Sequence, residues 1–161
     1  MPFARAKSKG HAASALQLIP DVRRHWDGIM SWDVFVQELP IEAQSVAEIP
    51  DDFRPGTIGQ RGEIIDAILG VFPEADFSEP SWGTIDQDGF SIEINLGAAE
   101  QVSSFALHVR GGGNAPDAIE SLLKALRMRA LDGHTGEIFS LDAAKKSFRE
   151  WQGYRDEIAK T

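Results

Sequence analysis

The alternation of apolar and polar residues in two neighbouring segments constrains the fold most. In residues 90–96 and 104–110, every second side chain is apolar, and mostly polar side chains separate them. Successive side chains of a strand point to opposite faces, so each segment should have one covered face and one face open to water or a partner. Residues 97–100, which begin with Gly97, predict the turn that joins the two strands as an antiparallel hairpin.

Further strands are expected on either side of this hairpin. Residues 31–39 are rich in β-branched and aromatic side chains and end before Pro40. Residues 81–86 form another short strand, followed by the turn signal Asp88-Gly89. Short elements around residues 129–132 and 137–139 are expected to add a strand or two. Residues 40–57 contain three prolines and are expected to form a long loop.

Three helices are expected from apolar residues that recur at spacings of three and four. A capping box at Thr57–Gln60 precedes the first helix, which should stop before Pro73. Asn114 is expected to cap the second helix, and Ser140 the third. The third helix carries an aromatic stripe that ends in Trp151 and Tyr154, which either packs on its own domain or docks a partner.

These elements predict an α+β fold with the order β-α-β-β-β-α-(β)-α. We expect a two-layer sandwich, a mainly antiparallel sheet with helices on one face. A length of 161 residues suits a single domain, assigned to residues 30–161. Residues 1–29 contain five basic and two acidic residues and are expected to be a disordered N-terminal extension. A basic docking arm is the alternative.

Charge is distributed unevenly along the sequence. The chain has 16 basic and 25 acidic residues, a net charge of −9, which argues against a nucleic-acid partner. Residues 31–100 contain 15 acidic residues, with Arg54 and Arg61 as the basic ones, whereas residues 101–161 are nearly balanced. The acidic half is either a surface that maintains solubility or a surface that meets a basic protein.

The open face of the hairpin holds the best candidate site. A carboxylate beside an imidazole on adjacent strands can act as a general acid–base pair, although exposed sheet residues commonly pair without function. Binding to a partner is therefore preferred over catalysis, and acidic residues of nearby loops are added to the site. The predicted partner-binding residues are Asp33, Asp51, Asp52, Asp86, Asp88, Glu93, Asn95, His108 and Arg110.

Several other chemistries find little support in the sequence. The absence of cysteine removes disulfides and thiolate zinc sites, and the four histidines lack metal-ligand spacing. No segment of about 20 apolar residues predicts a membrane span. Gly111-Gly112-Gly113 is interpreted as a sharp turn, with a weak anion-binding loop as the alternative. We therefore expect no metal, no cofactor and no catalytic residues.

Four segments carry a family resemblance: Met30–Val34, Ile49–Phe53, Ala75–Gly83 and His108–Gly112. They resemble a group of small, acidic, uncharacterised bacterial proteins, over about residues 30–140. In size, acidity and α+β pattern the chain is also similar to immunity proteins of bacterial toxin systems. This resemblance implies no particular catalytic residue.

The sequence thus favours a cytoplasmic protein-binding protein of the immunity type, which would neutralise a basic toxin domain through its acidic surface. Two alternatives stay open. One is a small enzyme or ligand-binding domain that uses the open sheet face, at Glu93, Asn95, His108 and Arg110. The other is a structural homodimer subunit, so that either a monomer or a homodimer is expected.

Overall fold

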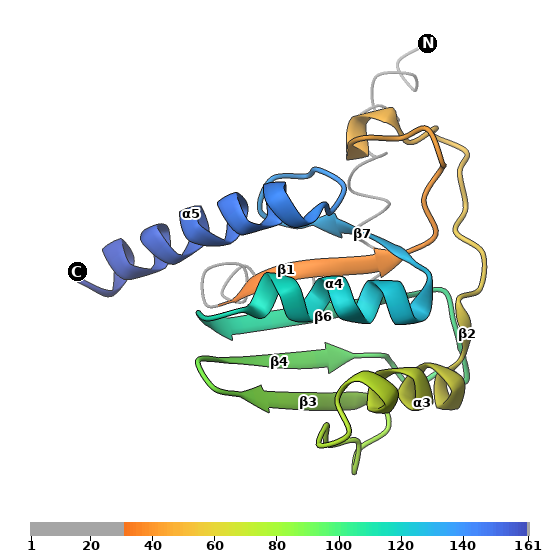
Figure 1. Cartoon of the computed structure of the whole chain (residues 1–161). Helices are drawn as coiled ribbons and strands as arrows, with labels where there is room; N and C mark the ends of the chain where they lie inside the picture. The colour runs from red at the N-terminus through yellow and green to blue at the C-terminus, as the bar shows by residue number, and fades with distance from the viewer. Residues whose placement is uncertain (1–30, 161) are drawn as a thin grey trace.

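The computed structural model describes residues 31–160 and is built around an antiparallel five-stranded sheet (Figure 1). From edge to edge, its strands are β3 (Trp82–Gln87), β4 (Phe90–Asn95), β6 (Ser104–Gly111), β1 (Trp32–Gln37) and β7 (Arg129–Asp132). The predicted hairpin is present as β4 and β6. The first strand of the chain lies between β6 and β7, so residues far apart in the sequence become neighbours.

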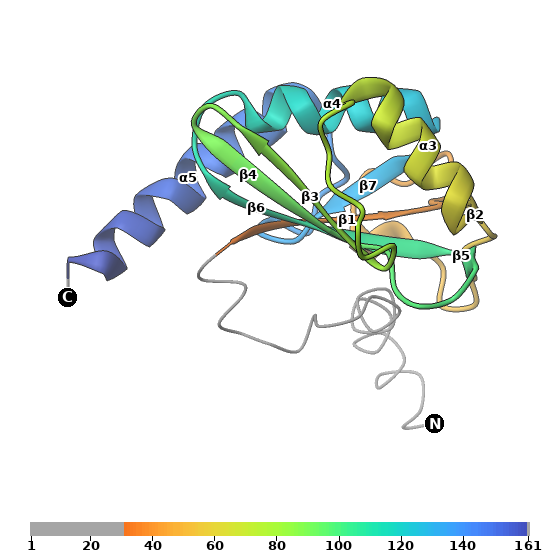
Figure 2. The ribbon, with the colours of Figure 1, turned by 90° about the horizontal axis from the view of Figure 1, so that it is seen from below.

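Three helices form the second layer, which confirms the predicted α+β sandwich (Figure 2). They are α3 (Arg61–Val71), α4 (Ala115–Leu126) and α5 (Leu141–Ala159). A short 3-10 helix, η1 (Val46–Glu48), lies within the long loop after β1. A second, two-stranded sheet joins β2 (Gly59–Gln60) to β5 (Gln101–Val102), and the sequence predicted neither of these strands.

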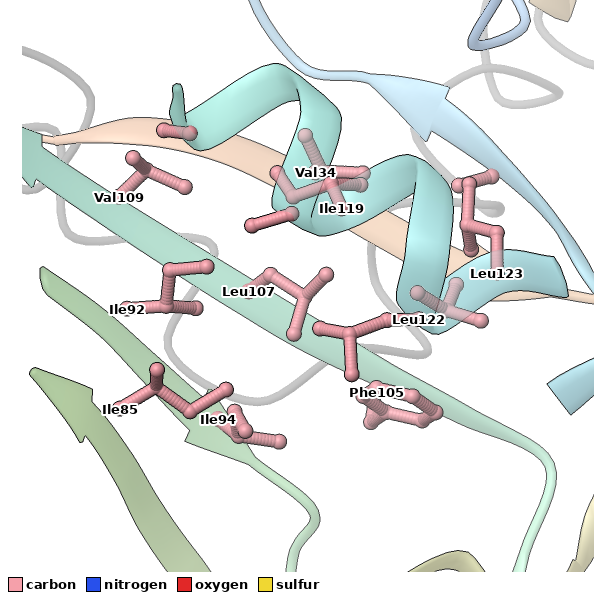
Figure 3. Packing of buried hydrophobic residues seen from close by; sticks show 14 of the residues in the cluster. Val34, Ile85, Ile92, Ile94, Phe105, Leu107, Val109, Ile119, Leu122 and Leu123 are labelled. Carbon is pink, nitrogen blue, oxygen red and sulfur yellow. The ribbon is translucent and has the colours of Figure 1, made fainter. Parts of the chain in front are cut away.

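The main core lies between the sheet and the helices (Figure 3). Ile92 and Ile94 of β4 and Leu107 of β6 point toward α4, which contributes Ile119 and Leu122; all five are at most 1% exposed. Burial of apolar surface is the dominant favourable contribution to folding. The alternation in the sequence therefore identified the covered face of the hairpin correctly.

A second, smaller apolar cluster lies on the opposite face of the sheet. Phe35 of β1 and Leu131 of β7 contact Leu39, Ala43 and Ile49 of the loop that follows β1. The expectation that this face is open was wrong at the β1–β7 end. The loop carries enough apolar side chains to cover Phe35. The expectation was based on the alternation in the β4–β6 hairpin and did not consider β1.

The caps of α3 and α4 differ from those that the sequence predicted. The capping box of α3 is formed by Gln60 and Glu63, not by Thr57 and Gln60. Gly59 and Gln60 are held extended by pairing with β5, so the helix cannot begin earlier. The helix ends before Pro73, as predicted. Asn114 precedes α4 as expected, but its side chain makes no capping hydrogen bond.

The last helix packs back on its own domain through its first half. Phe148 and Trp151 are buried in the main core, and Ser147 accepts a hydrogen bond from Trp32 Nε1 at 3.1 Å. Trp151 is therefore a core residue, and the docking interpretation does not apply to it. Tyr154, one turn later, is 53% exposed. Residues 137–139 form isolated bridges and no separate strand.

Gly111 marks the point where β6 must turn sharply into the segment before α4. Its φ is +96°, and a Cβ atom there would lie 2.5 Å from the carbonyl oxygen of Gly89. The backbone conformation and the close approach both require glycine. The N–H of Gly112 donates to the same carbonyl at 2.6 Å. The glycine run therefore works as a tight turn against the β3–β4 hairpin.

We expect Gly111→Ala to destabilise the protein by roughly 2–4 kcal/mol, because it combines left-handed strain with a backbone clash. Gly97→Ala is the control, since Gly97 also has a positive φ but has open space around it. That variant should lose only about 1 kcal/mol. Urea denaturation of both variants measures the difference, and equal losses would contradict the steric explanation.

Candidate functional site

The strand register aligns four polar residues across four strands on the face away from the helices. Thr84 of β3 pairs with Glu93 of β4, Glu93 with His108 of β6, and His108 with Asp33 of β1. We call these four residues the polar row. The neighbouring row contains Asp86, Ser91 and Arg110. The predicted residues Glu93, His108, Arg110 and Asp33 are therefore brought together.

His108 pairs with Asp33, and not with Glu93 as the acid–base hypothesis required. Its Nδ1 lies 2.8 Å from Asp33 Oδ1, and the Ser31 hydroxyl donates to the same oxygen at 2.6 Å. The carboxylate can only accept, so Nδ1 is the donor. His108 is 4% exposed, and its Nε2 has no hydrogen-bond partner among the described residues. A buried polar atom without a partner is unusual in a folded protein.

Glu93 instead connects Trp82 to Arg110. The indole Nε1 of Trp82 donates to Glu93 Oε2 at 3.0 Å, and the Arg110 guanidinium donates to Glu93 Oε1. The Trp82 ring also stacks on the His108 ring, with centroids 5.9 Å apart and an interplanar angle of 20°. Trp82 thus lies across the polar row and is fixed at both its nitrogen and its face.

Trp82 is not among the partner-binding residues that the sequence predicted. The structure pairs Trp82 with Asn95, a residue that the alternation had assigned to the polar face. Once the β3–β4 turn is placed at Asp88-Gly89, counting back along the register puts Trp82 on that face. Asn95 itself is 4% exposed and so is buried, contrary to the expectation of an open position.

The predicted acidic residues do not all gather at one place. Asp51 and Asp52 follow η1, in the loop that covers β1 and β7. Asp86 and Asp88 lie on β3 and in its turn, at the opposite edge of the sheet. All four are exposed. The structure therefore provides two separate acidic regions where the sequence suggested a single surface.

The more concentrated acidic region follows the outer edge of the sheet. We call it the β3 edge; it consists of the exposed residues Glu74, Asp76, Glu79, Asp86 and Asp88. The chain contains no lysine or arginine between Arg61 and Arg110. Within residues 31–160, the ion pairs of the structure involve none of these five carboxylates.

Local hydrogen bonds keep two of these carboxylates ionised. The hydroxyl and the backbone N–H of Ser78 donate to Asp76, and those of Ser81 donate to Glu79. In each case the side-chain bond is the main cause that lowers the pKa of the carboxyl below its ordinary value, and the backbone bond adds to it. The charge of the β3 edge therefore persists further into the acidic range than that of free carboxylates.

One hollow among the described residues lies away from the polar row. A hollow of about 410 Å³ is lined by Arg54, Leu96 and Ser104, toward the other end of β4 and β6. Across the described part of the chain, no three His, Asp or Glu side chains converge to hold a metal ion. None of the helices in residues 31–160 is both long and apolar enough to cross a membrane.

Comparison of the chain with protein-family models, with curated proteins and with solved structures finds no match. The resemblance to small acidic bacterial proteins and to immunity proteins therefore stays a prediction. Of the predicted domain boundaries, residues 1–29 lie outside the described residues.

We expect Asp33→Ala to destabilise the protein by about 1–3 kcal/mol, because it leaves the buried His108 Nδ1 without its acceptor. Arg110→Ala is the comparison, since it breaks an ion pair that is about one-third exposed on both sides. Such a pair contributes less than about 1 kcal/mol. Urea denaturation of the two variants tests this ranking. A larger loss of unfolding free energy in Arg110→Ala would show that the exposed ion pair contributes more to stability than the Asp33–His108 pair.

We expect Ser78→Ala to raise the pKa of Asp76 toward its ordinary value and to leave Glu79 unchanged. Ser81→Ala should do the reverse, so that each variant is the control for the other. A lowered pKa means that the stabilising bonds are intact above the ordinary pKa and are lost as the pH falls through the folded one. Carboxyl ¹³C chemical shifts followed across an acid titration measure both pKa values, and no change in either variant would refute the assignment.

Proposed function

We propose that the chain is a protein-binding protein of the immunity type, acting in the cytoplasm. Its β3 edge would cover a basic surface of a toxin and so keep substrate away from it. The observation that carries the proposal is the group of five exposed carboxylates, none of which forms an ion pair within the described residues, although the charge of Arg61 helps to lower the pKa of Glu79. Complementary charge of this kind selects a partner and speeds association.

The position of the carboxylates supports this proposal. Asp76 and Thr84 exchange two backbone hydrogen bonds, of 2.8 and 3.0 Å, which hold the segment before β3 against the sheet. Gln87 Nε2 donates to Glu74 Oε1 at 2.5 Å, which fixes that carboxylate too. Carboxylates that are already ordered lose less conformational entropy on binding than side chains on a free tail.

The charge is also asymmetric across the molecule. The β3 edge lies at one side of the sheet, whereas α5, which packs near β1, contains four basic and four acidic residues (Figure 1). A basic partner is therefore attracted more strongly to the β3 edge than to α5. Such a field orients the partner during approach, and its effect weakens as salt screens the charges.

A second candidate function is a small-ligand or catalytic domain that uses the polar row. The unpartnered Nε2 of His108 favours it, because Asp33 orients the ring and leaves this nitrogen as an acceptor. General bases in enzymes are oriented in this way. Burial of the nitrogen makes this the weaker candidate, since a ligand reaches it only if Trp82 or its surroundings move.

The proposal is tested by neutralising the β3 edge with the combined substitutions E74Q, D76N, E79Q, D86N and D88N. A protein captured from a lysate by the full chain should lose at least tenfold in affinity for this variant, because long-range attraction and direct ion pairs both disappear. The control is E120Q, D142N, E150Q, D156N and E157Q, which removes the same number of charges from α4 and α5. Affinity for the purified partner is measured by calorimetry at several salt concentrations.

The control variant should bind like the original chain, and raising the salt should weaken only binding that depends on the β3 edge. The captured partner, expressed alone, should inhibit growth, and expression of this chain with it should restore growth. Equal losses in both variants would show that only net charge matters. A partner whose binding is independent of salt and of the β3 edge would refute the proposal.

A further inference from the structure

Trp82, the first residue of β3, has features of a binding platform. Trp82 is half-buried, and stacking on His108 uses one side of its ring. Its indole nitrogen is already bonded to Glu93, so the ring cannot rotate without losing that bond. A fixed, partly exposed tryptophan is the residue type most often found at the energetic centre of protein interfaces.

Charged groups around this ring are mainly negative. Glu79 lies three residues before Trp82, and the Trp82 N–H donates to the Glu79 carbonyl oxygen at 3.0 Å. Glu93 accepts a hydrogen bond from the ring nitrogen, and Asp86 lies on the same face of β3, four residue pairs along the strand. Arg110 neutralises Glu93 by its ion pair, which leaves Glu79 and Asp86 to attract a cation.

From these contacts we propose that Trp82 is the platform on which the basic protein partner places an arginine side chain. This inference rests on the proposed function and names the contact at its centre. A guanidinium group can stack flat on an indole ring and at the same time donate two hydrogen bonds to a carboxylate. A lysine ammonium can approach the ring but lacks the planar pair of donors, so arginine is the better fit.

The chain itself contains an example of the contact. In the described region, the guanidinium carbon of Arg155 lies 4.9 Å from the centroid of the Trp151 ring. That pair is internal, because Trp151 is 1% exposed in the core. Trp82 resembles Trp151 in being held by its neighbours, but it is only half-buried and belongs to β3, the strand beside the acidic residues of the β3 edge.

The hydrogen bond between Asp33 and His108 gives the Trp82 ring its support. The ring of His108 forms the lower layer of the stack, and Asp33 fixes His108 through Nδ1. Ser31 fixes Asp33 in turn. Contacts with His108 of β6, which Asp33 of β1 orients, hold the Trp82 ring in one orientation before a partner binds. Pre-organisation of this kind increases affinity.

The experiment titrates the ¹⁵N-labelled full chain with hexa-arginine amide at low ionic strength. We expect the indole N–H signal of Trp82 to shift saturably, together with the backbone amides of residues 74–88. Hexa-citrulline amide, which has the same shape without charge, should shift neither. Hexa-lysine amide should bind about 2–5-fold more weakly than hexa-arginine, because it cannot stack and pair at once.

Two variants show whether the ring itself binds. Trp82→Leu should weaken hexa-arginine binding by about 3–10-fold, as followed by the amides of residues 74–88. Trp82→Phe, which keeps an aromatic face and identifies the Trp82 signal by its loss, should weaken binding less than Trp82→Leu. Thr84→Val is the matched control, because it changes the adjacent residue of the polar row and leaves the ring in place.

The outcomes separate this inference from the proposed function. Shifts in residues 74–88 without a shift of the Trp82 indole, or equal affinity in Trp82→Leu, would overturn the platform and leave the acidic edge as the binding surface. No saturable shift anywhere on the chain would overturn both. If Trp82→Leu fails to fold, the affinities of Trp82→Phe and Thr84→Val for hexa-arginine are compared instead. Equal affinities of these two variants would refute the platform.

Discussion

The packing of one face of the β4–β6 hairpin against α4 is the constraint on which the other features depend. Ile92, Ile94 and Leu107 are completely or almost completely buried there. Because side chains alternate along a strand, a register shift by one residue would expose all of them, so the register is fixed by the core. The same register fixes which side chains lie on the other face. The alignment of Glu93 with His108 is therefore a consequence of hydrophobic packing.

Local pattern was enough to predict the hairpin, the helices and the two-layer architecture. Local pattern could not predict the pairing of β1 with β6. Asp33 and His108 are 75 residues apart, and local sequence does not indicate which strands become neighbours. The same limit explains the second apolar cluster, in which Phe35 meets Ile49 of the following loop. The candidate site was thus predicted in its residue types but not in its partners. His108 was identified, whereas its bond to Asp33 and its contact with Trp82 needed the strand order.

The Asp33–His108 hydrogen bond and the β3 edge have different physical effects. His108 is buried and the Asp33 side chain is 14% exposed, so salt screens their hydrogen bond only weakly and its loss appears as a loss of stability. The carboxylates of the β3 edge are exposed, contribute little to stability, and act at a distance on whatever approaches. Trp82 is the residue that connects the two, since it touches both His108 and Glu93.

Protection of an exposed strand is the simplest competing explanation for acidic residues at a sheet edge. Charged side chains on an edge strand prevent it from pairing with other chains. In this protein, however, the backbone of β3 is already engaged, because Asp76 pairs with Thr84 on its outer side. Protection would then need few charges, yet five carboxylates gather there, and serine hydrogen bonds lower the pKa of two of them. Edge protection leaves this excess unexplained, whereas the proposed recognition of a basic surface would account for it.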